Sequence, residues 1–326
     1  MYIYPTLHIR ISFEFLKPKK RRENSQLYFI PLFSLIRNNE DMRTITIDID
    51  KCIECGKCVA ICPSHVYRKG KNKAIQITNL PYCIDCGHCV AICPKDAITH
   101  SAFPPQKIRS LDFSKRPTPA QVLELCEGRR SNRVFSTQAV PEESLSLILR
   151  AAHAAPTAEN RQFVEFTLVT DPKKILEIST YTIAVFDRIM KILTNPIIKT
   201  CLKPFASDLY KMIPEFTAMK RKFEKGQDEI LRGAKALLFI HSKKNRFGAA
   251  DANLAYQNAS LMAESLQIAH FYTGFVLAAQ ENDLHKDKLA QLLGIEGKVY
   301  AGMALGMPKL HFEKIIYKKD IVVNRI

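Results

Sequence analysis

The hydrophobic residues of this chain predict short strands near its N-terminus and helices further on. The stretches from Ile45 to Ile49 and from Ala74 to Thr78 are short and β-prone, and they suit small hairpins. From Pro141 to His153, apolar residues recur on one helical stripe behind two acidic residues that suit a helix N-terminus. The stripe consists of Leu145, Ile148, Leu149 and Ala152, and the acidic residues are Glu142 and Glu143. This pattern predicts an amphipathic helix over 141–153.

Proline marks the boundary between these two parts. Phe103-Pro104-Pro105 and Arg116-Pro117-Thr118-Pro119 bracket an extended linker. Pro119 suits the first position of a helix, which we expect to run through Gln121–Cys126 and to stop near Gly128. The sequence thus predicts an extension over 1–41, a small domain over 42–103, a linker over 104–118 and a larger domain over 119–326.

Aromatic and methionine side chains recur at helical spacing between basic residues over 173–232, and we expect most of them to serve in packing. Prolines interrupt this region at Pro196, Pro204 and Pro214, which predicts several short helices. The large side chains are Tyr181, Phe186, Met190, Phe205, Tyr210, Met212, Phe216 and Met219.

Eight of the ten cysteines fall into two copies of one spacing. Each copy reads C-x2-C-x2-C-x3-C-P, which is the signature of [4Fe–4S] clusters in bacterial ferredoxins. Gly56 and Gly87 lie just before the third cysteine of each copy and let the backbone turn tightly. A structural zinc site also uses C-x-x-C pairs, but zinc does not explain a third and a fourth cysteine at fixed offsets with a trailing proline. The copies are Cys52, Cys55, Cys58, Cys62 with Pro63, and Cys83, Cys86, Cys89, Cys93 with Pro94.

The fourth cysteine of each copy is expected to ligate the other cluster, because the chain crosses between the two halves. One cluster is then held by Cys52, Cys55, Cys58 and Cys93, and the other by Cys83, Cys86, Cys89 and Cys62. With this repeat, residues 42–103 resemble the two-cluster bacterial ferredoxins. The remaining cysteines, Cys126 and Cys201, lie in apolar, helix-like stretches, and we expect both to pack inertly in a core.

A chain of 326 residues has room for this small domain and one larger domain. Cluster thiolates imply a reducing compartment, so we expect a cytoplasmic location. The net charge of +16 is spread along the chain and favours anionic partners, among them an acidic, low-potential electron carrier such as a ferredoxin. The sequence has no GxGxxG or P-loop pattern, so it does not signal a Rossmann nucleotide site. It has no RNP-like or helix-turn-helix signature, so nucleic acid is not an expected partner.

Residues 1–41 differ from the rest of the chain. A basic run, Lys17-Pro18-Lys19-Lys20-Arg21-Arg22, precedes an apolar run from Leu27 to Ile36 that is too short to span a bilayer. No small-residue cleavage site follows before Arg37, and the residues around Arg21-Arg22 do not support a twin-arginine signal. We expect an upstream start or an unstructured extension, with Met42 as the natural start and no membrane association.

The larger domain carries a dense group of anion-binding residues. Three arginines and a serine stand within Arg129-Arg130-Ser131-Asn132-Arg133, and arginine forks match phosphate oxygens bidentately. Taken alone, such a segment is more often a basic surface turn. Here three further segments follow it. The first is Ala155-Pro156-Thr157-Ala158-Glu159-Asn160-Arg161-Gln162, and the second is a long helix that begins near Asp251 and continues through Leu266 to Gly274. The third is Gly302–Pro308, which fits a last core strand and turn. In this order and spacing, residues 118–320 resemble the flavin-dependent nitroreductase superfamily.

The resemblance implies a binding site for FMN. The arginine segment would hold the phosphate and the ribityl chain, a loop would reach the flavin from the other subunit, a turn would lie near the isoalloxazine ring, and a late basic residue would contact the phosphate. The residues implied are Arg129, Arg130, Ser131 and Arg133; Pro156, Thr157 and Asn160 with Gln162 beside them; Thr273 and Gly274; and Lys318, where the family usually has arginine. The chain departs from the family at Gln267, Ile268 and Ala269, where Gly-Leu-Gly is frequent, so we expect a less permissive backbone there. We expect His153, His270 and His285 to be structural.

The resemblance also implies the fold and the activity. It predicts an α+β fold, with a small ferredoxin-like two-cluster domain followed by an α+β sandwich whose largely antiparallel sheet is flanked by helices, in a homodimer with the flavin at the interface. Residues 173–232 would cap the flavin face. Two [4Fe–4S] clusters would pass electrons to FMN, which reduces an organic acceptor such as a nitroaromatic, a quinone or an activated alkene, and the hydride is carried by the flavin rather than by a protein acid. The alternative is an iron–sulfur protein that binds or scavenges flavin without turnover.

Overall fold

The structure is a computed structural model that describes residues 43–326 except 205, 206, 244 and 286. The expectations for residues 1–41, for Met42 and for Phe205 therefore lie outside the described residues. By its internal contacts the described chain divides into two compact units. The first unit contains residues 43–116 with 159–161, and the second contains residues 117–158 and 162–326. Each unit is described by itself below.

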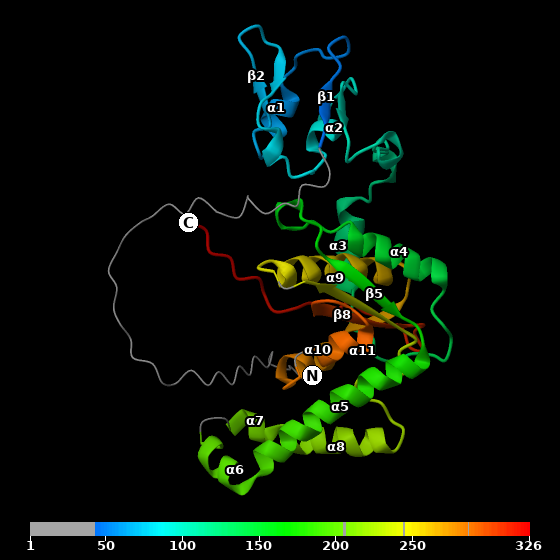
Figure 1. The fold of residues 1–326 in the computed structure, drawn as a ribbon. Coiled ribbons are helices and arrows are strands. Elements are labelled where there is room, and N and C mark those ends of the chain that lie inside the picture. The colour runs from blue at the N-terminus through cyan, green and yellow to red at the C-terminus, as the bar shows by residue number, and fades with distance from the viewer. Residues whose placement is uncertain (1–42, 205–206, 244, 286) are drawn as a thin grey trace, which may run out of the picture. The chain divides into compact units, whose positions relative to one another are not determined.

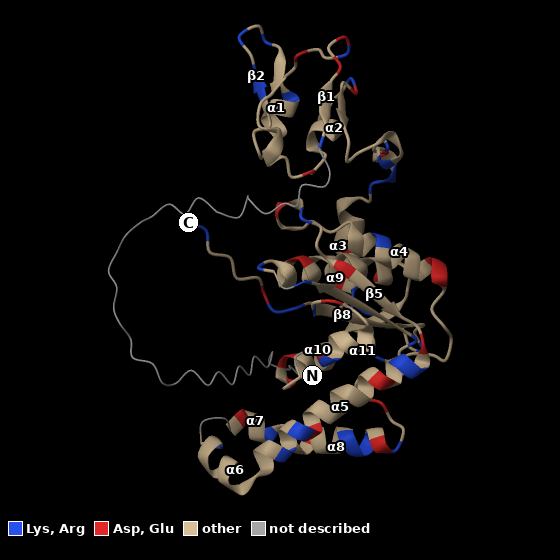
Figure 2. Ribbon diagram, in the orientation of Figure 1, with Lys and Arg blue, Asp and Glu red and all other residues tan. Residues whose placement is uncertain are grey.

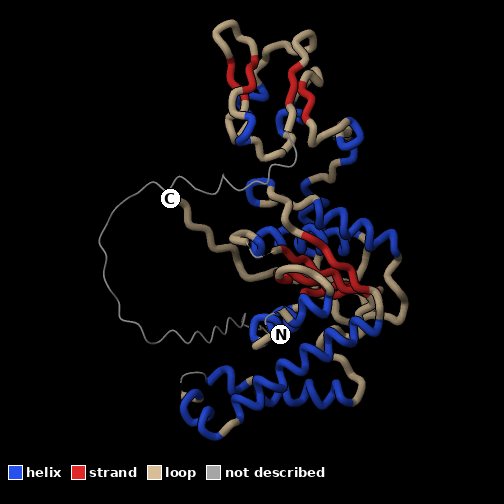
Figure 3. Tube along the Cα trace, in the orientation of Figure 1, coloured by secondary structure: helices blue, strands red, loops and turns tan. Residues whose placement is uncertain are grey.

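The first unit is built from two antiparallel strand pairs and two short helices (Figure 3). Strands fall within both stretches that the sequence predicts, but only β2 and β3 are neighbours in the chain, whereas β1 pairs with β4 across both cysteine runs. Its elements are β1 (Ile45–Ile47), α1 (Lys57–Ile61), β2 (Tyr67–Lys69), β3 (Ile75–Ile77), α2 (His88–Ile92) and β4 (Ile98–His100), with short 3-10 turns at Leu80–Tyr82, Pro105–Lys107 and Phe113–Lys115.

The second unit contains one four-stranded antiparallel sheet between helices (Figure 1). The strand order is β5 (Glu165–Val169), β6 (Ala236–Ser242), β8 (Lys298–Gly306) and β7 (Ala269–Tyr272). The helices are α3 (Pro119–Gly128), α4 (Glu142–His153), α5 (Pro172–Thr194), α6 (Pro196–Leu202), α7 (Ser207–Lys211), α8 (Ile213–Glu224), α9 (Gly248–Ser265), α10 (Gly274–Asn282) and α11 (Lys288–Leu293). A 3-10 turn at Ala158–Asn160 begins in this unit and continues into residues counted with the first. The α+β class and the antiparallel sheet flanked by helices are as predicted.

The alternation of side chains along β6 creates one hydrophobic core on each face of the sheet. Leu237 and Phe239 pack against α5, α10 and α11, whereas Leu238 and Ile240 pack against α4 and α9. All four side chains are fully buried, as expected for the central strand of a three-layer domain. The sheet is therefore held rigidly from both sides, and residues at its ends have a fixed platform.

Two predicted helices are confirmed. In α3, Pro119 occupies the first turn, and Thr118 and Gln121 form a capping box in which each side chain accepts a hydrogen bond from the other residue's backbone N–H. In α4, the buried residues Leu145, Ile148 and Ala152 belong to the predicted stripe.

Two expectations are wrong, and one is confirmed in part. The helix that begins near Asp251 ends at Ser265, and β7 follows, because residues from Ala269 onward find antiparallel partners on β8. The short helices predicted for 173–232 are present from Pro196 onward as α6, α7 and α8, whereas the stretch before Pro196 forms one helix of 23 residues because no proline interrupts it. Cys126 and Cys201 are exposed rather than buried.

The packing role of the large side chains in this region is confirmed where the structure describes them. The ring of Phe186 lies 4.8 Å from that of Phe216 at a tilt of 51°, and both rings lie within 6.4 Å of Phe275 on α10. These contacts hold α8 against α5 and the sheet core. Figure 2 shows basic and acidic residues on helices and loops of both units. In the described part of the chain, no helix combines the length and the apolar character that crossing a membrane requires.

Candidate functional site

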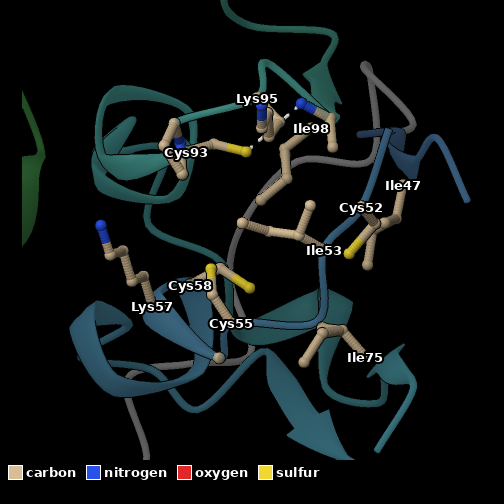
Figure 4. A pocket seen from close by; sticks show the side chains of 13 residues that line it. Ile47, Cys52, Ile53, Cys55, Lys57, Cys58, Ile75, Cys93, Lys95 and Ile98 are labelled. Carbon is tan, nitrogen blue, oxygen red and sulfur yellow. Dashed lines mark hydrogen bonds between the residues drawn. The ribbon is translucent and has the colours of Figure 1, made fainter. Parts of the chain in front are cut away.

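Four cysteines surround one cavity in the first unit. Cys52, Cys55 and Cys58 come from the first cysteine run, and Cys93 comes from the end of the second (Figure 4). The left-handed backbone of Gly56, at φ 74°, turns the chain into α1 and brings Cys58 inward. The rest of the lining is largely apolar, with Ile47, Ile53, Ile75 and Ile98.

A second cavity is surrounded by the other four cysteines, Cys83, Cys86, Cys89 and Cys62. Gly87 takes the same left-handed backbone, at φ 69°, and a side chain there would lie 3.1 Å from the ring of Phe103. The structure therefore collects the eight cysteines in two crossed groups, each with the fourth cysteine of the other run.

The donor set of these cavities fits iron–sulfur clusters. Burial raises the pKa of the Cys58, Cys83 and Cys89 thiols, so their ionised form needs a cation to offset the lost hydration. Backbone N–H groups of Val66 and Ala97 donate to the sulfurs of Cys62 and Cys93, each at 3.3 Å. Four thiolates with backbone donors around a compact space are what a [4Fe–4S] cluster requires.

The second cavity has polar neighbours that the sequence analysis missed. His100 Nε2 lies 3.5 Å from the sulfur of Cys83 and 3.6 Å from a carboxylate oxygen of Asp85. Arg43 donates to Asp85 at 2.7 Å and to the carbonyl of Cys83 at 3.0 Å. The hydroxyl of Tyr67 is buried and, among the described residues, has no hydrogen-bond partner within range. A comparison of the two cysteine repeats would have pointed to Tyr67 and His100, because their counterparts in the other repeat are the different residues Ile98 and Lys69.

In the second unit, the arginine segment runs along the end of the sheet. Arg129 is the C-cap of α3, and from there the chain is extended. The Asn132 N–H donates to the carbonyl of His270 at 3.0 Å, and its side-chain amide donates to the carbonyl of Leu310 at 2.8 Å. Phe135 then forms a bridge with Pro308 and stacks on Phe271. Asn132, which the sequence analysis did not select, is thus the residue that fixes the segment to β7.

The electrostatic surroundings of this segment are positive. Burial raises the pKa of Tyr256 and of Glu264, and the charge of Arg129 acts on both groups in the opposite direction. The guanidinium of Arg133 lies 5.5 Å from the centre of the Phe271 ring. A backbone N–H of Arg130 stabilises the Glu264 carboxylate. Three guanidinium groups on one extended segment, with a half-buried Ser131 among them, are chemically suited to a phosphate.

Arg130 also holds the C-terminal tail, because its guanidinium donates to the carbonyl of Ile316. Lys318 follows two residues later and is exposed. The structure thus brings the tail that carries Lys318 to the arginine segment.

Thr273 and Gly274 lie where β7 meets α10. The Thr273 N–H donates to the carbonyl of Gly302 at 2.9 Å. Its hydroxyl is buried without a hydrogen-bond partner among the described residues, whereas Gly274 is exposed at the start of α10. At the departure from the family pattern, Gln267 takes a left-handed backbone at φ 57°, so the turn that glycine favours is kept with a different residue.

The loop that contains Pro156, Thr157 and Gln162 lies elsewhere on the second unit. The Thr157 hydroxyl accepts from the Gln162 N–H at 3.0 Å, and the neighbouring Ala158 N–H donates to Asp251 at 3.0 Å. Asn160, which is counted with the first unit, takes a left-handed backbone at φ 50°, and its side-chain amide donates to the carbonyls of Ile84 at 3.1 Å and Asp85 at 2.6 Å. Asp251 lies near the start of α9 and Glu264 near its end, and thirteen residues at about 1.5 Å each separate them by ~20 Å. Within one chain, the loop and the arginine segment are thus anchored at opposite ends of α9.

The three histidines differ in their surroundings. His270 is buried, accepts a hydrogen bond from Ser260 at Nε2 and donates to the carbonyl of Ile268 from Nδ1. The structural role expected for it is confirmed by these contacts. His153 and His285 are exposed; the His153 ring lies 6.3 Å from that of Phe166, and the backbone N–H of His285 donates to Asp283 at 3.2 Å.

Comparison with known proteins identifies both parts of the chain. Residues 126–307 match the nitroreductase family, and residues 44–94 match the 4Fe-4S dicluster domain. The chain therefore belongs to the nitroreductase family and carries an N-terminal 4Fe-4S dicluster ferredoxin domain.

The chain is also similar to individual proteins over part of its length. Ferredoxin-2 of Desulfomicrobium norvegicum is 47% identical over 32 residues, which are 10% of this chain and 54% of that protein, so the match spans about half of its length. A nitroreductase with bound FMN from Desulfitobacterium hafniense DCB-2 is 19% identical, with a TM-score of 0.48 over 63% of this chain and 98% of that chain. An FMN-dependent nitroreductase from Clostridium difficile R20291 is 20% identical, with a TM-score of 0.45 over 64% of this chain and 100% of that chain.

Proposed function

We propose that this protein is an electron-transfer oxidoreductase that accepts electrons from a low-potential donor through two [4Fe–4S] clusters and uses FMN to reduce an organic acceptor. The observation that carries the proposal is that one polypeptide combines two kinds of site. It has two cavities that are each lined by four cysteines, and a nitroreductase-family domain with an arginine segment suited to binding a phosphate. FMN, when bound, supplies the conversion from one-electron supply to two-electron chemistry. Nitroaromatics, quinones and activated alkenes are the acceptor classes we propose.

The residues of the chain have distinct parts in this function. The eight cysteines hold the clusters, and the guanidinium groups of Arg129, Arg130 and Arg133 hold the phosphate with help from Ser131 and Lys318. Thr273 and Gly274 offer backbone and hydroxyl groups near the ring. Because Pro156, Thr157, Asn160 and Gln162 lie in a loop anchored ~20 Å along α9 from the arginine segment, we propose that they serve the flavin of a second copy, in a homodimer.

The phosphate assignment is tested by replacing Arg129 with alanine. Arg129→Ala removes a guanidinium fork and should weaken FMN affinity by about tenfold to a hundredfold, since a hydrogen bond to a charged group contributes on the order of 1.5–3 kcal/mol. The FMN occupancy of the purified protein should fall accordingly. Iron content should stay unchanged, because the cysteines lie in the other unit. Arg150→Ala, at an exposed arginine of α4, is the matched control and should keep its flavin. Unchanged flavin in Arg129→Ala removes Arg129 from the phosphate site.

Turnover separates the enzyme from a protein that merely stores flavin. In protein purified without oxygen, reduced ferredoxin should bleach the cluster and flavin absorbance, and a nitroarene should restore it. Bleaching without recovery by nitroarenes, quinones or activated alkenes favours the storage alternative. With an acidic ferredoxin as donor, the rate of bleaching should fall as salt is added, and a rate independent of salt excludes an electrostatically guided donor.

A further inference from the structure

The two cluster cavities have equivalent backbones but different side chains. Residues two positions apart on a strand point to the same face of the strand pair. Along that face, one such residue lines the first cavity and the next lines the second. In the pair of β1 and β4, Ile47 lies opposite Ile98 at the first cavity, and Ile45 lies opposite His100 at the second. The first cavity is thus lined by hydrocarbon where the second has an imidazole.

The cysteine repeats make this comparison residue by residue. His100 stands seventeen positions after Cys83, and the residue seventeen positions after Cys52 is Lys69, which is exposed. Tyr67 stands fifteen positions after Cys52 and lines the second cavity, whereas Ile98 stands fifteen positions after Cys83 and lines the first. Both polar substitutions of the repeat therefore fall at the same cavity.

The hydrogen position on His100 is determined by its neighbours. The Ala102 N–H donates to Nδ1 at 3.1 Å, so Nδ1 is the acceptor and the neutral ring carries its hydrogen on Nε2. Nε2 lies 3.5 Å from the Cys83 sulfur, within range for a donor to sulfur. The ring is 1% exposed and packs edge-on against Phe103, so it has no freedom to turn away.

The Tyr67 side chain is 4% exposed, and its hydroxyl lacks a partner among the described residues. A buried hydroxyl without a partner is costly, which implies that an acceptor completes this site when the protein is loaded. The Cys89 sulfur is the candidate acceptor, because Cys89 and Tyr67 line the same cavity and lie in the same buried cluster.

Asp85 adds a carboxylate beside Cys83, and its charge is offset by Arg43. The donor atoms of Cys83, Asp85 and His100 lie within 4.8 Å of one another, a spacing that also suits a single metal ion. Arg43 already forms an ion pair with Oδ2 of Asp85 at 2.7 Å, and Cys83 is one of the four cysteines that line the second cavity. The three residues therefore surround one corner of the cluster site rather than forming a separate one.

We propose that Tyr67 and His100 set the reduction potential of one cluster alone: they donate hydrogen bonds to the Cys89 and Cys83 thiolates and raise the potential of the cluster in the second cavity. The inference rests on the cluster assignment of the proposed function. One-electron reduction adds a negative charge to a cluster, and hydrogen bonds to its sulfurs stabilise the more negative state. The donor that supplies the electron is the low-potential carrier proposed above, or dithionite in the experiment.

The experiment is a potentiometric titration of the full-length, cluster-loaded protein, followed by electron paramagnetic resonance. Tyr67→Phe removes one oxygen, and His100→Leu removes the ring donor. Each variant should lower the reduction potential of one cluster by ~59 mV, which corresponds to a tenfold change in the oxidised-to-reduced ratio of a one-electron couple. The reduction potential of the other cluster should not change. His100→Gln restores a donor and should recover part of the shift, and Lys69→Leu is the control at the matching position of the other repeat. Cys55→Ser perturbs the first cavity and so identifies which couple belongs to it.

The inference is overturned if Tyr67→Phe and His100→Leu move both couples together, move the couple that Cys55→Ser marks, or move neither while about eight iron atoms per chain are retained. If His100→Leu loses its iron, the near-isosteric Tyr67→Phe decides the result by itself. Wild-type protein without iron contradicts the proposed function as well, whereas normal iron with unmoved potentials contradicts this inference alone.

Discussion

His270 illustrates how burial at a single position fixes the chemistry of a side chain. Its Nδ1 faces the carbonyl of Ile268 and its Nε2 accepts from Ser260, so the neutral ring satisfies both neighbours. Burial lowers the pKa of His270 below the ordinary value, and the charge of Arg129 adds to the effect. Burial likewise lowers the pKa of His241, which lies on β6. A protonated ring at either position would lack hydration in the folded protein.

The stability of the protein should therefore decrease in mild acid. Above pH about 6.5, His270 is neutral in both the folded and the unfolded chain, and pH has no effect through this group. Below it, the unfolded chain binds a proton that the folded chain does not, so the free energy of unfolding decreases by up to ~1.4 kcal/mol per pH unit for one histidine.

Denaturant unfolding between pH 7.5 and 5.5, followed by circular dichroism, measures this slope. His270→Gln should flatten it, and His153→Gln, at an exposed histidine of α4, should not. Equal slopes in the two variants contradict the assignment.

Among the elements, the arginine segment depends on how closely it approaches β8. Phe135 lies over Gly306 at the end of that strand, and a side chain at this position would meet the Phe135 ring at 2.6 Å. Phe135 in turn bridges to Pro308 and stacks on Phe271, so the segment, the strand end and β7 form one packed unit. Glycine is required here by close approach rather than by a special backbone angle.

Gly306→Ala should consequently disturb binding as well as folding. The added methyl group forces Phe135 outward, which we expect to cost about 1–3 kcal/mol of stability by overpacking. Because Arg129, Arg130 and Arg133 lie on the displaced segment, FMN occupancy should fall as well. Thermal unfolding and the flavin-to-protein absorbance ratio measure the two effects. Gly128→Ala, where an added side chain meets nothing within 4 Å, is the matched control and should keep both values. A Gly306→Ala protein with normal stability and flavin would show that the segment is held without this contact.

Across the whole molecule, local patterns predicted most of the fold and a smaller part of the site. The cysteine spacing and the α4 stripe are local, and both were read directly. β7 was taken for a continuation of α9, because its strand character depends on partners on β8 more than thirty positions away. Tyr67 and His100 were missed for a related reason, since only the pairing register brings them to the same cavity. The exposure of Cys126 was also unpredictable from periodicity, because none of the residues of α3 is buried within this chain.

A proposed site shared between two copies has a consequence that single variants cannot show. Arg129→Ala and Gln162→Asn each damage one half of the proposed flavin site, and asparagine tolerates the left-handed backbone that Gln162 uses. If the halves come from different chains, each variant alone should bind little FMN. When the two are produced together, a mixed dimer contains one site with both defects and one with none. With equal amounts and random pairing, about a quarter of all sites should then recover FMN, since half of the dimers are mixed and each has one intact site.

Flavin content of co-produced protein, purified through two different affinity tags, measures this recovery in mixed dimers directly. If the mixed dimers bind no more FMN than the separate variants, both halves belong to the same chain, and the ~20 Å separation along α9 must be bridged in another way.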